Sequence, residues 1–203
     1  MKAARFAAAA AVATAALVLI PAGPASAVNP STTISSPGNG ATLTNSTVPI
    51  SGSTSIPPGL LNGNTITGVA ISVTGASTAS CSNSGCGATV GGTSTSFSFH
   101  PVLAFNGPYT VTANTSASEA GILGSTPRSD SASASFRLAV PPAAPHGVSA
   151  VANADRSVTV SWARNTEPDI LGYQVERQDP SSSQLSAAAN VAQPAGGSSV
   201  SWT

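Results

Sequence analysis

The sequence predicts an all-β protein in which two tandem β-sandwiches follow an N-terminal export signal. Three observations support this prediction: short runs of alternating apolar and polar residues recur along the chain, no apolar repeat of helical period follows residue 27, and a Pro-rich segment at 141–145 divides the chain. A chain of 203 residues has room for two domains.

The composition excludes some classes of partner. Charged residues make up 7% of the chain, with seven basic and seven acidic side chains. Such a sparse and balanced charge creates no field that would attract nucleic acid or an anionic membrane. A chain rich in Ser, Thr and Gly can be disordered, but its β-branched residues alternate in the way that strands require. We therefore expect folded β-structure and no nucleic-acid partner.

The N-terminus has the parts of a secretory signal peptide. A basic start at 1–5 precedes an apolar run at 6–20, and an Ala-x-Ala triplet ends at Ala27. The apolar run is shorter than the about 20 residues that a membrane-spanning helix needs. We expect cleavage after Ala27, a secreted or cell-surface location, and no membrane insertion after cleavage.

Six short strands are expected between the signal peptide and the Pro-rich segment. They alternate apolar with polar residues and are bounded by Gly, Pro or Asn. The clearest has Val69, Ile71 and Val73 on one face. Many short strands at near-regular spacing favour a sandwich over an α/β fold. The expected strands are 32–36, 48–52, 68–74, 96–99, 109–113 and 133–140.

Residues 106–113, Asn-Gly-Pro-Tyr-Thr-Val-Thr-Ala, fit a tyrosine corner, in which a turn leads into a Tyr and an alternating strand. We expect the Tyr109 hydroxyl to bond a nearby backbone group, with the ring in the core. With the turn formers at 36–41 before it and Phe-Arg-Leu-Ala-Val-Pro-Pro at 136–142 behind it, this half resembles a bacterial immunoglobulin-like domain. The resemblance implies an immunoglobulin-like β-sandwich at 28–140.

A second strand pattern follows the linker at 141–145, which its Pro residues should keep extended and fairly stiff. In 157–162 and 172–177 apolar residues alternate with polar ones, which predicts two strands joined by a turn. A Trp in a chain with few aromatic residues needs a core around it. Trp162 and Tyr173 are therefore the expected core residues of this half.

This second pattern, with Pro145-His-Gly-Val148 before it and Pro168-Asp169 at the turn, resembles the opening strands of a fibronectin type III domain. The resemblance implies such a domain at 146–203. In that family a segment like Val200-Ser-Trp-Thr precedes two further strands. We therefore expect the second sandwich to be incomplete, a partial fibronectin type III domain in a fragment of a secreted bacterial protein.

Cys81 and Cys86 enclose a short loop that contains Gly. In an exported protein this spacing favours a disulfide, whereas a zinc site would want four ligands and finds at most the distant His100. A ring this short limits the gain in stability to about 2 kcal/mol on the loop-entropy model. The disulfide should shape a loop more than hold the domain, with free thiols or a metal as the alternatives.

The histidines and serines form no catalytic pattern. His100 and His146 lie in different halves, and neither has a nucleophile, carboxylate or second ligand beside it in sequence. No Gly-x-Ser-x-Gly elbow occurs, so the many Ser residues are interpreted as solvated strand faces.

The carboxylates are equally uninformative. Glu119 and Asp130 are the acids of the first half, and they predict neither a calcium loop nor a glycosidase pair. Glu167 and Asp169 flank Pro168 and could be an acid pair, but a turn before the next strand explains them better. We expect no catalytic, cofactor-binding or metal residue, and no enzyme activity in this chain.

These patterns lead to two hypotheses of function. The first is a non-catalytic extracellular array that spaces or presents binding surfaces at the cell surface, with an extracellular protein or polysaccharide as partner. The alternative is a set of accessory modules of a secreted polysaccharide-degrading glycoside hydrolase, whose catalytic domain would lie beyond Thr203. Sequence beyond Thr203 would separate the two hypotheses.

Overall fold

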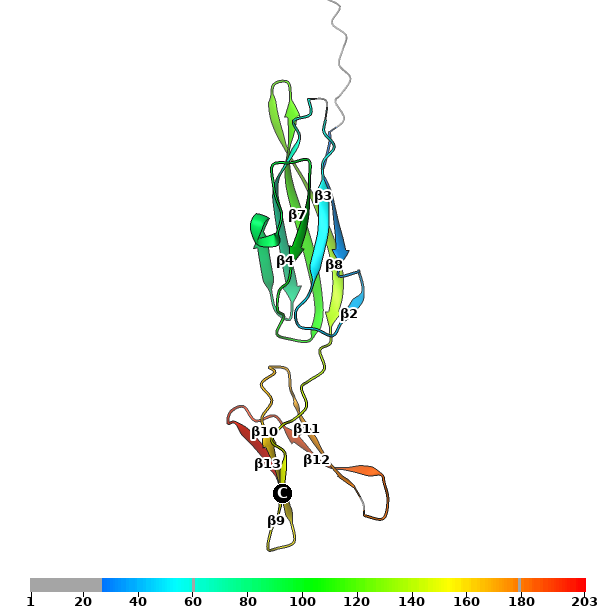
Figure 1. Cartoon of the computed structure of the whole chain (residues 1–203), viewed down its shortest axis with the longest axis vertical. Coiled ribbons are helices and arrows are strands. Elements are labelled where there is room, and N and C mark those ends of the chain that lie inside the picture. The colour runs from blue at the N-terminus through cyan, green and yellow to red at the C-terminus, as the bar shows by residue number, and fades with distance from the viewer. Residues whose placement is uncertain (1–26, 60, 179) are drawn as a thin grey trace, which may run out of the picture.

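The computed structural model describes residues 27–59, 61–178 and 180–203. Within these ranges the chain forms strands β1 to β13 and one short 3-10 helix, η1. The strands make two units that lie end to end in an elongated molecule (Figure 1). None of the described segments is an apolar helix with the length of a membrane span. The predicted signal peptide, Ala27 apart, lies outside the described residues.

The first unit consists of two packed sheets. One has the strand order β1-β3-β6 and is antiparallel. The other has the order β2-β8-β7-β4-β5 and is antiparallel except for the parallel pair of β2 with β8. The strands are β1 (Ser31–Ser36), β2 (Ala41–Leu43), β3 (Ile50–Ser55), β4 (Thr65–Gly75), β5 (Ala79–Ser82), β6 (Ser94–Phe99), β7 (Gly107–Gly121) and β8 (Gly124–Leu138).

The predicted alternation places apolar side chains between these two sheets. Val69, Ile71 and Val73 of β4 are buried, as expected from the sequence. Tyr109 of β7 stacks on Phe136 of β8, with 5.5 Å between the ring centroids. Each large side chain buried in this way contributes about 1.5–3 kcal/mol before conformational entropy opposes it. The other large members of this core are Val48, Ile50, Ile56, Ile66, Phe97, Leu103, Val111 and Leu138.

Gly52 of β3 occupies a position that excludes any larger residue. A Cβ atom there would lie 2.1 Å from the carbonyl oxygen of Thr33 and 2.4 Å from Cζ of Phe97. Gly52 is the register partner of Phe97 across β3 and β6, so the aromatic ring covers the space above the glycine. The close approach of ring and backbone therefore depends on the missing side chain.

Strands β7 and β8 form a hairpin longer than the sequence indicated. Pairing runs from Gly107 opposite Leu138 to Gly121 opposite Gly124, whereas the sequence predicts strands only at 109–113 and 133–140. The hairpin projects beyond the other strands at the end of the molecule away from the second unit (Figure 1).

The second unit also has two sheets. β9 (Ser149–Ala152), β10 (Val158–Ala163) and β13 (Ser199–Trp202) form an antiparallel sheet in the order β13-β10-β9. β11 (Gly172–Gln178) and β12 (Leu185–Ala192) form an antiparallel pair. Trp162 of β10 meets Tyr173 of β11 edge to face, with 5.1 Å between the ring centroids. The two expected core aromatics thus join the two sheets.

The pairing of the second unit's strands goes beyond what the sequence predicts. The strands expected at 157–162 and 172–177 are not paired with each other, because β10 pairs with β9 and β13 while β11 pairs with β12. The turn at Pro168 and Asp169 is present. The chain uses it to cross from one sheet to the other, which is how Trp162 and Tyr173 come to face each other.

The cysteines are joined as predicted. Cys81 of β5 and Cys86, the last residue of η1 (Asn83–Cys86), form a disulfide with 5.4 Å between their Cα atoms. Cys86 is fully buried, and the side-chain oxygen of Asn83 accepts a hydrogen bond from the Val69 N–H at 2.9 Å. The disulfide therefore closes a loop that is already docked on β4.

Candidate functional site

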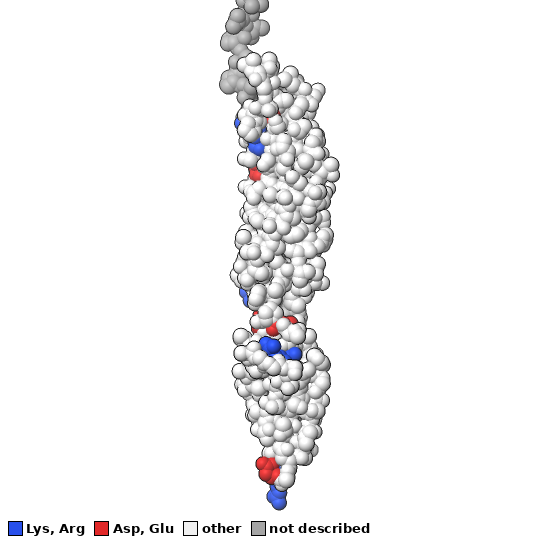
Figure 2. All heavy atoms as spheres, turned by 90° about the vertical axis from the view of Figure 1, so that its left-hand side faces the viewer, with Lys and Arg blue, Asp and Glu red and all other residues white. Residues whose placement is uncertain are grey.

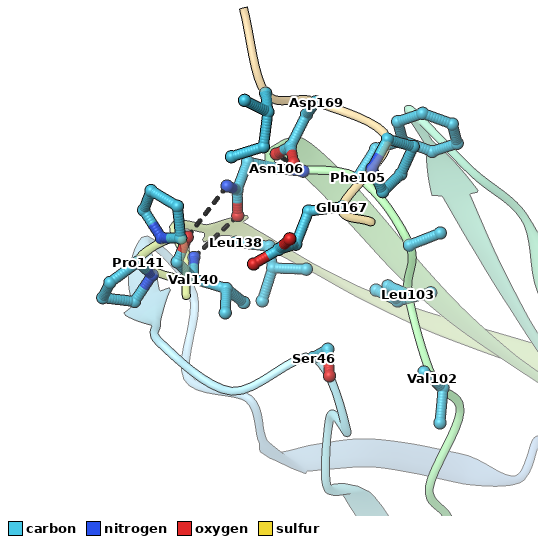
Figure 3. A pocket seen from close by; sticks show the side chains of 14 residues that line it. Ser46, Val102, Leu103, Phe105, Asn106, Leu138, Val140, Pro141, Glu167 and Asp169 are labelled. Atoms are coloured by element: carbon cyan, nitrogen blue, oxygen red, sulfur yellow. Dashed lines mark hydrogen bonds between the residues drawn. The ribbon is translucent and has the colours of Figure 1, made fainter. Parts of the chain in front are cut away.

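The junction between the two units contains a cavity of about 310 Å³. The loop before β7, the end of β8, the start of the linker and the turn before β11 border it (Figure 3). Leu103, Phe105 and Leu138 supply apolar surface to this cavity. Its polar lining comes from Ser46, Asn106, Glu167 and Asp169. Polar side chains from distant parts of the sequence converge here, which makes the junction the candidate functional site.

Asn106 fixes the path of the chain as it leaves the first unit. Its Oδ1 accepts a hydrogen bond from the Val140 N–H at 2.6 Å, and its Nδ2 donates to the Val140 carbonyl at 3.0 Å (Figure 3). One side-chain amide thus satisfies both backbone groups of a residue 34 positions away, just before the linker. The loop before β7 therefore sets the direction in which the linker leaves the first unit.

Two carboxylates of the second unit reach across the junction. Asp169 Oδ2 accepts a hydrogen bond from the backbone N–H of Asn106 at 3.3 Å. Glu167 Oε1 accepts one from the N–H of Ala143 in the linker at 2.7 Å. The Ala143 N–H, more than any other contact, holds the pKa of Glu167 below its ordinary value. Figure 2 shows acidic and basic atoms close together at this waist of the molecule.

Asn165 completes the attachment of the linker. Its Nδ2 donates to the Ala143 carbonyl at 2.8 Å, so both backbone groups of Ala143 are bound by the second unit. The backbone of Asn165 is held in turn: its N–H donates to the Tyr173 hydroxyl at 2.8 Å, and its carbonyl accepts from Gln193 Nε2 at 2.9 Å. The expected core residue Tyr173 therefore also supports the junction.

Four buried polar atoms near this attachment have no hydrogen-bond partner among the described residues. Two are donors, Trp162 Nε1 and Arg164 Nε, and two are acceptors, Asn165 Oδ1 and Gln193 Oε1. An unsatisfied buried group costs about 1–3 kcal/mol. Among the described residues of the second unit, the unpaired buried polar atoms therefore gather at the end that meets the linker.

The remaining residues considered from sequence lie apart from the junction cavity. His100 and His146 are exposed, and Glu119 forms an ion pair with Arg128. Asp130 accepts a hydrogen bond from the Thr32 N–H at 2.7 Å. Within residues 27–59, 61–178 and 180–203, no three His, Cys, Asp or Glu side chains gather in a way that could hold a metal ion.

Sequence reasoning identified Glu167 and Asp169 as turn residues but missed their partners. The bond from Asn106 to Asp169 spans 63 residues and that from Ala143 to Glu167 spans 24. The only local signal was an acid on each side of Pro168. Both carboxylates accept hydrogen bonds from backbone N–H groups, Asp169 from the first unit and Glu167 from the linker. They therefore attach the second unit to these segments.

Comparison with known proteins does not assign the chain to a family. No protein-family model matches the chain, and no curated protein matches it. Among solved structures, the chain is similar to the FN1-FN3 domains of chicken CNTN1, with 14% sequence identity and a TM-score of 0.25. The match covers 81% of this chain and 53% of that chain, so it spans about half the length of that structure.

Proposed function

We propose that this chain is an exported, non-catalytic spacer that holds binding surfaces at a set separation at the cell surface. In this proposal residues 28–140 are an immunoglobulin-like sandwich, 141–145 are the linker, and 146–203 are a fibronectin type III-like module. The observation that carries it is the hydrogen-bonded junction, in which the linker and both units are tied together.

The junction supports a spacer because its bonds restrain the linker at several points. Val140 is bound by Asn106 on the side of the first unit, and Ala143 is bound by Glu167 and Asn165 on the side of the second. The bond from Asn106 to Asp169 bypasses the linker and joins the two units directly. The net contribution of one such hydrogen bond to stability is about 0.5–1.5 kcal/mol, so together the bonds oppose free rotation of one unit against the other.

A flexible tether would have no use for these contacts. The Pro residues of the segment Pro141-Pro-Ala-Ala-Pro145 already favour an extended backbone. The added hydrogen bonds favour one direction for that extended segment. A spacer that presents a partner at a defined distance needs both properties.

Residual dipolar couplings in a weakly aligning medium test this proposal. For the chain from Val28 to Thr203 we expect one alignment tensor to fit the backbone N–H couplings of both units. The double variant Glu167→Ala with Asp169→Ala should give two different tensors, whereas Glu176→Ala, on exposed β11, should leave one. Two independent tensors in the unsubstituted chain would contradict a rigid spacer.

A further inference from the structure

The backbone nitrogen of Val28 lies beside a carboxylate at the far end of the first unit. It donates a hydrogen bond to Glu119 Oε1 at 3.4 Å. The Val28 side chain is half-buried and packs against the hydrophobic core, while the preceding Ala27 is exposed. The bond between Ala27 and Val28 therefore joins an exposed residue to an anchored one.

The other oxygen of the same carboxylate is already paired. Arg128 Nε donates to Glu119 Oε2 at 2.7 Å, and its Nη2 lies 2.5 Å from that oxygen. The side chains of Glu119 and Arg128 are 17% and 25% exposed, so solvent screens this pair only in part. Since Arg128 uses Oε2, Oε1 is directed at Val28.

These atoms border a cavity of about 820 Å³. Its lining includes Val28, Leu61 and the β7–β8 hairpin, which carries Glu119 and Arg128. The cavity is thus made partly by Val28 itself, and its charged wall faces the Val28 nitrogen.

The sequence places the expected cleavage at this same peptide bond. The Ala25-Ser-Ala27 triplet predicts that a signal peptidase hydrolyses the bond between Ala27 and Val28. Water supplies the oxygen of the new Ala27 carboxylate, and Val28 is left with an α-amino group that takes up a proton near neutral pH. A neutral amide donor 3.4 Å from Glu119 would become a cation at that position.

We propose that Glu119, held by Arg128, is a binding site for the α-ammonium group that signal-peptide removal creates on Val28. The inference rests on the proposed export of this chain. Cleavage replaces a neutral donor with a cationic one, so the hydrogen bond from Val28 to the Glu119 carboxylate becomes an ion pair. This ion pair stabilises the mature chain relative to its precursor, at the end of the first unit where the β7–β8 hairpin projects.

The neighbouring charges set the size of the effect. Arg128 on β8 is a like charge for the ammonium and opposes it, while Glu119 on β7 attracts it. Asp130 lies two residues after Arg128 on β8, and its carboxylate accepts a hydrogen bond from the Thr32 N–H. Because the carboxylate contact is the nearest, the net effect should favour the protonated amine.

The sign of the pH dependence follows from this. We expect the pKa of the Val28 amine to be higher in the folded protein than the about 7.7–8.0 of an unfolded terminus. The stabilisation is then fully present below the unfolded value, and it is lost as the pH rises through the folded value.

NMR titration of the Val28 α-amino nitrogen tests the proposal on the protein that begins at Val28. The pKa should be raised in the unsubstituted protein and fall toward about 7.7–8.0 in Glu119→Gln. A protein that begins one residue earlier, at Ala27, should show an ordinary terminal pKa, since Ala27 is exposed. This second comparison decides the matter even where Glu119→Gln does not fold. Equal pKa values for the termini at Val28 and Ala27 would overturn the proposal.

The first residue of the exported protein is a separate readout. Mass spectrometry of secreted material should find Val28 at the N-terminus, and any other first residue would overturn the inference. Neither result bears on the alignment tensors of the two units, so failure of the terminal site can be told from failure of the spacer proposal. Glu176→Gln, on β11 of the second unit, is the matched control and should leave the terminal pKa unchanged.

Discussion

The hydroxyl of Tyr109 donates a hydrogen bond to the carbonyl oxygen of Phe105 at 2.7 Å, four residues back along the chain. The ring is 2% exposed, so it bridges the turn before β7 and the core between the sheets. Ser77 shares the hydroxyl at 3.0 Å from the neighbouring segment. This geometry has the features that the sequence predicted for a tyrosine corner.

Replacing Tyr109 with Phe should remove the corner without changing the packing of the ring. We expect the free energy of unfolding of the first unit to fall by about 1–3 kcal/mol, because the Phe105 carbonyl loses its partner. Urea unfolding measures this. Ser77→Ala, which removes only the second contact of the hydroxyl, should cost less. An unfolding midpoint equal to that of the unsubstituted protein would show that the bond contributes nothing.

Gly52→Ala should destabilise the first unit through overpacking. The new Cβ would lie within 2.4 Å of both the Thr33 carbonyl oxygen and the Phe97 ring, so strand β3 or the ring must move. Such insertions cost roughly 1–3 kcal/mol, and more where backbone is involved. Thermal unfolding should show a lower Tm. Gly38→Ala is the matched control, since nothing lies within 4 Å of its Cβ position, and a loss as large there would contradict the steric explanation.

Cys81 and Cys86 should titrate as two thiols only after reduction of the secreted protein. The double variant Cys81→Ser with Cys86→Ser should lose about 2 kcal/mol of stability, because the closed ring is short. The loss should be small beside the core, since Asn83 still anchors the loop to Val69. Two free thiols in unreduced material would contradict the disulfide.

Acid should release the linker from the second unit. The Ala143 N–H holds the pKa of Glu167 below its ordinary value. The contribution of this contact to stability is therefore fully present above the unfolded pKa of about 4.3, and it is lost as the pH falls through the lower folded pKa. The NMR chemical shift of the Ala143 amide should change with pH, and its midpoint should follow the lowered pKa of Glu167. In Glu167→Gln the same amide should not follow this titration, and a midpoint at the ordinary Glu value would contradict the contact.

The sequence predicted best those features in which neighbours along the chain determine the structure. Alternation in β4 placed Val69, Ile71 and Val73 correctly, and local spacing found the Tyr109 corner and the cysteine pair. These features are short-range, so periodicity and turn formers are enough to show them.

Long-range pairing was harder to predict. The outer half of the β7–β8 hairpin consists mostly of small and polar residues, so its sequence lacks the alternation of large apolar with polar residues that marks a half-buried strand. β2 and β5 are only three and four residues long and depend on partners elsewhere. The junction contacts of Glu167 and Asp169 come from tertiary structure and have no local pattern.

The two units should differ in their resistance to proteolysis, since their cores differ. The buried hydrophobic cluster lies within the first unit, which has two sheets closed over Tyr109 and Phe136. In the described part of the second unit, Trp162 and Val200 are the buried apolar residues. Burial of each large side chain contributes about 1.5–3 kcal/mol, so the first unit has many more such contributions to offset its chain entropy.

Protease should therefore cut beyond Val148 first and leave a resistant fragment that ends near 141–145. Exposed β9 and β12 offer accessible backbone, whereas β4 and β7 are protected in the middle of a sheet. Fragment masses over a time course of limited digestion measure the order of cleavage. Tyr109→Phe is the informative variant, because it should speed loss of the resistant fragment and leave the first cuts unchanged. Equal protection of both units would show that the open faces of the second unit are covered in solution by a contact that its own described residues do not supply.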